Sequence, residues 1–215
     1  MTKDEFLKLT GNFKNIVFDY GGILIDLDYD IAVRNLTRLS ERSDASNIYS
    51  KSKQLPFFSS YEKGNINCDE FLSKLMSHLD IPAKKKEETK EAWNSMILDL
   101  HQERVNFIRE LRKSKRLFIL SNINQLHEDY VDSYLEKNES VKDFYSLFEK
   151  VYFSHHLGFR KPEPEIFEYI LNDSQLKKEE TFFIDDSPQH VEGARSVGLT
   201  AYHLERPNTL FFSKA

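Results

Sequence analysis

Cysteine and long apolar runs are scarce in this sequence, and basic residues are outnumbered by acidic ones. Cys68 is the one cysteine among 215 residues, so no disulfide can form within the chain, and we expect a reducing, cytoplasmic compartment. No apolar run approaches the roughly 18 residues that cross a bilayer, which predicts a soluble protein with no membrane partner. Acidic residues outnumber basic ones by 35 to 30, and the net charge of −5 argues against nucleic acid as the main partner.

The order of the apolar segments predicts an α/β fold. A chain of 215 residues with 40% hydrophobic and 30% charged residues can bury one full core and carry an insertion. Short runs of β-forming residues alternate with helical patterns in the second half of the chain, as in a doubly wound, Rossmann-like parallel sheet. The predicted strands are residues 15–18, 116–120, 151–153, 181–184 and 200–204.

A helical block follows the first predicted strand. From about residue 30 to residue 100 apolar residues recur at helical spacing, and no strand pattern is evident. The clearest stripe starts behind a predicted N-cap at Asn67 and consists of Phe71, Leu72, Leu75, Met76 and Leu79. Pro82 suits the start of a further helix, predicted to run through Trp93 to Met96 and Ile97. We therefore predict a core of residues 1–27 and 101–215, with residues 28–100 inserted.

Polar residues stand where three of the predicted strands end. Asp19 follows the first strand and precedes two glycines, Ser121 and Asn122 end the second, and Asp185-Asp186 ends the fourth. Because parallel strands present their carboxyl ends at one edge of a sheet, we expect these groups to converge. Each residue alone is typical of a turn or a helix cap, so the interpretation depends on their joint occurrence.

The chemistry of such a cluster favours a divalent cation and a phosphoryl group. Carboxylates at one point repel each other unless a cation lies between them, and oxygen ligands favour Mg²⁺. A hydroxyl, backbone amides and the nearby Lys161 are suited to hold phosphoryl oxygens. An aspartate beside Mg²⁺ can attack phosphorus and form an aspartyl-phosphate.

Four motifs in this order resemble those of the haloacid dehalogenase-like (HAD) superfamily of hydrolases. They are residues 18–22 (FDYGG), 120–122 (LSN), 160–167 (RKPEPEIF) and 183–187 (FIDDS). Residues 122–127 and the Gly-Gly form of the first motif are most similar to a phosphatase branch that contains α-D-glucose-1-phosphate phosphatase. The resemblance implies a helical cap inserted in the core and a Mg²⁺-dependent phosphatase acting on a small phosphate monoester, such as a sugar phosphate.

The same resemblance assigns expected roles in binding the metal ion. Asp19 would be both the nucleophile and a Mg²⁺ ligand, and the carbonyl of Gly21 would be a second ligand. Asp186 would bind the ion directly, and Asp185 would act through a water molecule.

Further roles concern the phosphate. Ser121, the amide of Asn122 and Lys161 would hold its oxygens and offset the charge of the transition state, and Gly22 is counted with them.

The chain departs from the family pattern at two positions. Gly21 stands where most phosphatases of the superfamily have a second Asp that acts as general acid and base. A bound water, another residue such as His127, or a leaving group that needs little help must compensate. His190 stands where related sequences often have Asn, and we expect it to orient the acidic pair.

Candidate pocket residues lie outside the four motifs. The predicted turn at residues 61–65 places Glu62 and Lys63 where they can face the site, and Trp93, Asn124 and His127 are further candidates. The adjacent pair of histidines at residues 155–156 has no third metal ligand at a usable spacing, so we expect no metal site there.

Three other functions compete with a phosphatase. A dehalogenase of the same superfamily also lacks an Asp at position 21, but it needs no cation and would not be expected to keep the acidic pair. A phosphoacceptor receiver domain places its acidic pair on the first strand, which is the reverse of the order here. A catalytically silent phosphate-binding protein remains open because of Gly21.

Overall fold

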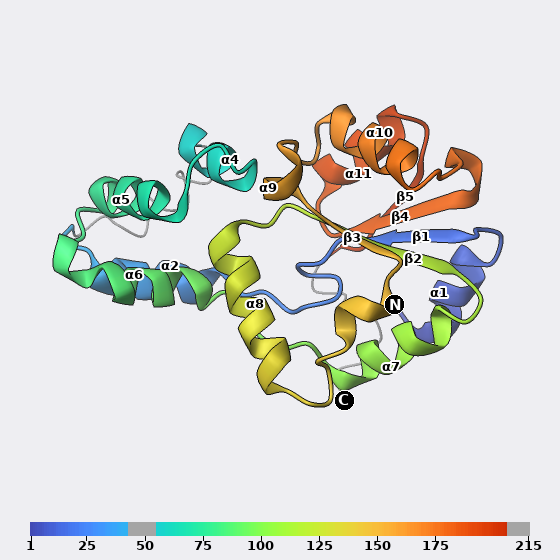
Figure 1. The fold of residues 1–215 in the computed structure, drawn as a ribbon, viewed down its shortest axis with the longest axis horizontal. Helices are drawn as coiled ribbons and strands as arrows, with labels where there is room; N and C mark the ends of the chain where they lie inside the picture. Colours follow the sequence, from blue (N-terminus) through green and yellow to red (C-terminus); the bar gives the residue numbers. More distant parts are fainter. Residues whose placement is uncertain (43–54, 206–215) are drawn as a thin grey trace.

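The computed structural model describes residues 1–42 and 55–205 and contains a five-stranded parallel sheet. The strands stand in the order β3-β2-β1-β4-β5, so the chain moves outward from β1 in both directions (Figure 1). Their bounds are β1 Asn15–Phe18, β2 Arg116–Ser121, β3 Lys150–Phe153, β4 Thr181–Asp185 and β5 Thr200–His203. The predicted α/β class with a doubly wound parallel sheet is confirmed.

Both faces of the sheet are buried, which explains why its strands are apolar without a polar alternate. On β1, Ile16 and Phe18 belong to one hydrophobic cluster and Val17 to a second one on the opposite face. Helices α10 and α11 cover the second face, and α1 and α7 cover the first (Figure 1). The helices around the sheet are α1 Lys3–Thr10, α7 Gln102–Leu111, α8 Gln125–Lys137, α9 Ser154–Leu157, α10 Pro164–Asp173 and α11 Pro188–Ser196, with short 3₁₀ turns at Phe144–Leu147 and Lys178–Glu180.

Helix α1 is an addition to the elements that the sequence predicted. Thr2 caps it, and Glu5 returns a side-chain bond to the backbone of Thr2, so a complete capping box sets its start. Its buried Phe6 stacks on Phe18 of β1 at a ring separation of 5.8 Å.

Among the described residues, four helices pack together to one side of the sheet (Figure 1). They are α2 Tyr29–Leu39, α4 Pro56–Glu62, α5 Cys68–Leu79 and α6 Lys86–Asn94, the last preceded by a 3₁₀ turn at Ala83–Lys85. Asn67 caps α5 as predicted, because its side chain accepts from the amide of Glu70 at 2.9 Å. The prediction that the last helix continues to Met96 and Ile97 is wrong, since α6 ends at Asn94.

The segment after α6 is not helical because it pairs with the segment that leads from β1 into the block of helices. Leu27 and Ile97 form an antiparallel bridge, and the amides of Asp26 and Asp28 donate to carbonyls across the same pair of connections. The carboxylate of Asp26 also forms a 2.6 Å ion pair with Arg104, whose side chain is fully buried. The two connections to the helical block are thus joined to each other and to α7.

Two predicted ranges extend beyond the part of the chain that the structure describes. Residues 43–54 belong to the predicted insertion, and residues 206–215 belong to the predicted core. Within the described residues, no helix has both the length and the apolar character needed to cross a bilayer.

Candidate active site

A cavity of about 320 Å³ opens at the carboxyl edge of the sheet, where the ends of β1, β2 and β4 meet. Its walls come from two sources. One side consists of strand-end residues, and the other of residues from α4, α6 and the start of α8. Open parallel sheets bind ligands at this edge, where the strand order reverses, so the cavity lies where the topology predicts a site.

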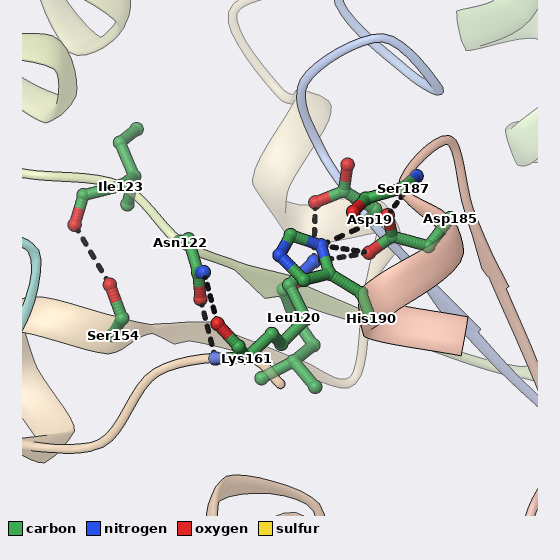
Figure 2. A network of polar contacts seen from close by, with 9 residues as sticks. All are labelled: Asp19, Leu120, Asn122, Ile123, Ser154, Lys161, Asp185, Ser187 and His190. Carbon is green, nitrogen blue, oxygen red and sulfur yellow. Dashed lines mark hydrogen bonds and ion pairs between the residues drawn. The ribbon is translucent and has the colours of Figure 1, made fainter. Parts of the chain in front are cut away.

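Asp19 stands at the centre of the strand-end side. Its amide donates to the carbonyl of Ile184 at 2.9 Å, which continues the pairing of β1 with β4 by one residue. Its carboxylate accepts a 2.7 Å hydrogen bond from Nζ of Lys161, a residue 142 positions later in the chain (Figure 2). The side chain lines the cavity and is largely buried.

Lys161 is fully buried and joins three elements. Its Nζ donates to Asp19, to Asp185 at 2.6 Å and to the carbonyl of Leu120 at 2.9 Å, which matches the three donors of an ammonium group. The backbone of Lys161 is held in turn by Asn122, whose side chain accepts from its amide and donates to its carbonyl, both at 2.8 Å (Figure 2). Asn122 therefore positions Lys161 through its side chain, a contact that the motif did not reveal.

Burial and mutual repulsion set the ionisation of the acids. Burial and the neighbouring charge of Asp185 raise the pKa of Asp19 to about 8, against the lowering effect of Lys161. Burial alone would raise the pKa of Asp185 as well, but Lys161 and His190 outweigh it and hold that pKa below its usual range. Desolvation works against the charged form of Lys161, yet Asp185 and Asp19 raise its pKa above the ordinary value.

The donor set fits a hard divalent cation. Asp19, Asp185 and Asp186 each offer a carboxylate oxygen, and these oxygens all lie within 4.8 Å of one another. Asp19 and Asp186 line the cavity, whereas Asp185 lies behind them, fully buried and bonded to Lys161, to His190 and to the amide of Ser187. One lysine cannot neutralise three converging carboxylates, so a cation bound through oxygen would relieve the repulsion that raises the pKa of Asp19.

The glycines after Asp19 differ in their surroundings. Gly21 lines the cavity, and a Cβ built on it would lie 2.5 Å from the side chain of Leu27. Leu27 therefore fills the space toward which a longer side chain at position 21 would point. The amide of Gly22 donates to the carbonyl of Ile25 at 2.7 Å, and Gly22 is not among the residues that line the cavity, so its role in binding phosphate stays a prediction.

The opposite wall brings together most of the predicted pocket residues. Glu62, Trp93, Asn124 and His127 all line the cavity, and Arg160 joins them. Glu62 and Arg160 form an ion pair at 2.7 Å, and burial raises the pKa of Glu62. Arg160 belongs to the third motif, next to Lys161, yet nothing in the sequence indicates that its side chain turns toward the cavity.

Lys63 is the exception among the predicted pocket residues. It is not among the residues that line the cavity, and its Nζ forms a 2.5 Å ion pair with Glu163. The turn after α4 directs Glu62 and Lys63 to different neighbours, so only the first of the two faces the site. A role for Lys63 in the pocket stays a prediction that this ion pair does not support.

His127 is held as a neutral ring. It stacks on Trp93 with ring centroids 5.0 Å apart, and burial lowers its pKa to about 4. Nδ2 of Asn124 donates to Nδ1 of His127 at 3.2 Å, so the ring proton is on Nε2, 3.4 Å from the carbonyl of Trp93. A histidine with so low a pKa is a poor general acid near neutral pH.

A second cluster of possible metal ligands lies outside the cavity. Glu128 of α8 approaches His155 and His156 of α9, with one donor atom from each residue within 4.8 Å of the others. The expectation that these histidines have no third ligand is wrong, because 27 residues separate Glu128 from His155 in sequence and local spacing does not show their contact.

Comparison with known proteins identifies relatives that cover nearly the whole chain. A D-ribitol-5-phosphate phosphatase from Bacteroides thetaiotaomicron is 33% identical over 192 residues, which are 89% of this chain and 92% of that protein. A sesquiterpene phosphatase from Aspergillus oryzae is 25% identical and covers 89% of this chain and 90% of its own length.

Solved structures are also similar to nearly the whole chain. An HAD family enzyme from B. thetaiotaomicron, in complex with magnesium and inorganic phosphate, matches 91% of this chain and 96% of its own with a TM-score of 0.80 and 30% identity. A dehalogenase with a TM-score of 0.64 is only 16% identical and shares the fold. A family model for haloacid dehalogenase-like hydrolases matches residues 13–198. The chain thus belongs to the haloacid dehalogenase-like hydrolases.

Proposed function

We propose that this hydrolase is a Mg²⁺-dependent phosphatase that acts on a small phosphate monoester through a phosphorylated Asp19. The observation that carries the proposal is the buried network in which Lys161 bonds Asp19 and Asp185 while Asp186 lines the same cavity. A dehalogenase site needs no cation, whereas this cluster of three carboxylates fits one. The phosphatase names of two relatives and the magnesium and phosphate bound by a third support the same function.

Each residue has a proposed part in the reaction. Asp19 attacks phosphorus as the bond from phosphorus to the ester oxygen breaks, and water then hydrolyses the aspartyl-phosphate to release phosphate. The bond of Asp19 to Lys161 fixes the direction of the attacking oxygen. Ser121 and the amide of Asn122 hold phosphoryl oxygens at the end of β2. Lys161, which is buried and bonded to Asp19, offsets the negative charge of the phosphoryl group. Asp19, Asp186 and the Gly21 carbonyl would hold Mg²⁺, with Asp185 acting through water, and the bound ion would supply positive charge at the phosphoryl group.

The leaving group receives its proton without an acid at position 21. Leu27 occupies the space beside Gly21, and His127 is neutral and turned toward Trp93. We propose that a water molecule in the cavity supplies this proton.

The helical insertion is proposed to act as a cap that selects the substrate. Residues 28–100 contribute Glu62 and Trp93 to the cavity wall, opposite the core of residues 1–27 and 101–215. A cavity of about 320 Å³ is at the small end of ligand sites and suits a compact substrate. The polar groups of Glu62, Arg160 and Asn124 match the hydroxyls of a sugar or sugar-alcohol phosphate, with D-ribitol 5-phosphate as the first candidate from the named relative.

The experiment measures phosphate release from D-ribitol 5-phosphate, a panel of sugar phosphates and a generic aryl phosphate, with Mg²⁺ and with excess chelator. Mg²⁺-dependent release is expected, and Asp19→Asn is expected to lower kcat on the order of 10⁴-fold or more because the amide cannot attack. Asp4→Asn on the exposed face of α1 serves as the control. Release that persists in chelator, or that Asp19→Asn leaves intact, would overturn the proposal.

A further inference from the structure

The second histidine cluster has the geometry of a built site. Nε2 of His155 lies 2.7 Å from Oε2 of Glu128, and Nε2 of His156 lies 2.9 Å from the same oxygen. Glu128 is in the first turn of α8, and both histidines are in α9, so two separate helices meet through these side chains. None of the three residues lines the cavity at the sheet edge.

A backbone hydrogen bond fixes which nitrogen of His155 carries the proton. Nδ1 lies 2.8 Å from the carbonyl oxygen of Ile123, and a carbonyl only accepts, so Nδ1 is the donor. In the neutral ring, Nε2 then presents its lone pair to the carboxylate of Glu128, which is also an acceptor. Two acceptors at 2.7 Å require either an additional proton or a cation between them. Histidine ligands in metal sites are oriented by this kind of Nδ1–H to carbonyl bond.

The exposure of the three side chains leaves a path for an ion. The side chains of His155 and Glu128 are 5% and 14% exposed, whereas that of His156 is 53% exposed. The cluster is therefore closed on the protein side and open to solvent past His156.

We propose that Glu128, His155 and His156 bind a Zn²⁺ ion. Two imidazole nitrogens and one carboxylate oxygen are a zinc ligand set in proteins, with a water molecule in the fourth position. Zinc bonds of about 2.0–2.1 Å place tetrahedral ligands roughly 3.3 Å apart, so the described side chains need to separate by only about half an ångström. The site is separate from the Asp19 cluster and does not depend on the function proposed for it.

A zinc ion at this position would lie next to residues that form the wall of the cavity at the sheet edge. Ile123, which accepts from His155, lines the cavity between Asn122 and Asn124. On the other side of His155, Gly64 in the turn after α4 packs so closely that a Cβ there would lie 2.2 Å from the His155 carbonyl. A zinc ion joining α8 to α9 would stabilise the point where the helical insertion meets the loop after β2 (Figure 1).

The test is Zn²⁺ binding to the full chain after chelator treatment, measured by calorimetry with Mg²⁺ in large excess to compete at the Asp19 cluster. One equivalent of Zn²⁺ is expected to bind, and Zn²⁺ is expected to raise Tm. His156→Ala changes a half-exposed residue, and Glu128→Gln preserves shape while removing the charge. Each is expected to weaken Zn²⁺ binding at least tenfold and to abolish the rise in Tm.

Controls separate this site from other metal binding. His78→Ala on α5 removes a histidine far from the cluster in sequence and is expected to leave Zn²⁺ affinity unchanged. Asp19→Asn is expected to do the same, which distinguishes this site from the carboxylate cluster. Co²⁺ in place of Zn²⁺ should give the visible absorption of a tetrahedral site in the wild type and not in His156→Ala. The proposal would be overturned if the folded wild type binds no Zn²⁺. It would also be overturned if His156→Ala and Glu128→Gln bind Zn²⁺ with the affinity of the wild type.

Discussion

The two walls of the cavity are built in different ways. On the strand-end wall, Asp19 and Asp186 follow directly from β1 and β4, and the buried Lys161 lies behind them, so hydrogen bonds of the sheet fix their positions. On the opposite wall, Glu62 and Trp93 come from helices whose places depend on packing with neighbouring helices. In the function that we propose, the chemistry depends on the strand-end wall and the choice of substrate on the opposite wall.

Apart from Asp19→Asn, Lys161→Met is expected to cause the largest change, in both stability and kcat. Removing the ammonium leaves Asp19 and Asp185 buried without their shared partner, which should cost about 3–5 kcal/mol of stability. We also expect kcat to fall roughly 10²–10³-fold because a charge aimed at the reacting group is lost. Urea unfolding and steady-state kinetics in Mg²⁺ measure the two effects.

Lys63→Met is the matched control. Lys63 also pairs with a carboxylate, that of Glu163, but both side chains are partly exposed, so the loss should be about 0–1 kcal/mol with kcat unchanged. Equal losses in the two variants would contradict the special importance of the buried lysine, Lys161.

A smaller effect, confined to substrate choice, is expected from Glu62→Gln. The change removes the charge that holds Arg160 at 2.7 Å in the cavity wall. KM for a sugar-alcohol phosphate should rise about tenfold, or about 1.4 kcal/mol of binding, while the generic aryl phosphate changes less. Glu70→Gln, in the first turn of α5, is the control. A fall in kcat as large as that of Asp19→Asn would show that Glu62 takes part in the reaction itself, and would contradict the proposed difference between the two walls.

The last effect is on stability alone and concerns its pH dependence at His127. The folded pKa of about 4 lies below the ordinary value of 6.5, so the unfolded chain binds a proton first as pH falls. The contribution of His127 is therefore complete above about pH 6.5 and declines from there toward pH 4, by about 3 kcal/mol in total. Urea unfolding at pH 7 and pH 5 should show a larger loss for the wild type than for His127→Gln. The same loss in both proteins would show that the ring is not held neutral.

The strand ends could be predicted from the sequence, whereas the details of the helical block could not. Apolar runs ending in Asp19, Ser121 and Asp185-Asp186 predicted three groups of polar residues at one sheet edge, because parallel strands align their ends by hydrogen bonding. The end of α6 was not predictable, since Ile97 leaves the helix to pair with Leu27, a contact across 70 residues.

Side-chain direction was the other feature that the sequence left open. Neighbouring residues in one turn, Glu62 and Lys63, face the cavity and Glu163 respectively, and no local pattern separates them. The contact of Glu128 with His155 depends on the packing of α8 against α9, which is a property of the tertiary structure.

The most direct measurement of the central claim is acid quenching of the enzyme during turnover of a phosphate ester, followed by mass spectrometry of its peptides. We expect a phosphoryl group on the peptide that contains Asp19, dependent on Mg²⁺ and absent from Asp19→Asn. Rapid turnover with the phosphoryl group on a different residue would contradict the assignment of Asp19 as the nucleophile.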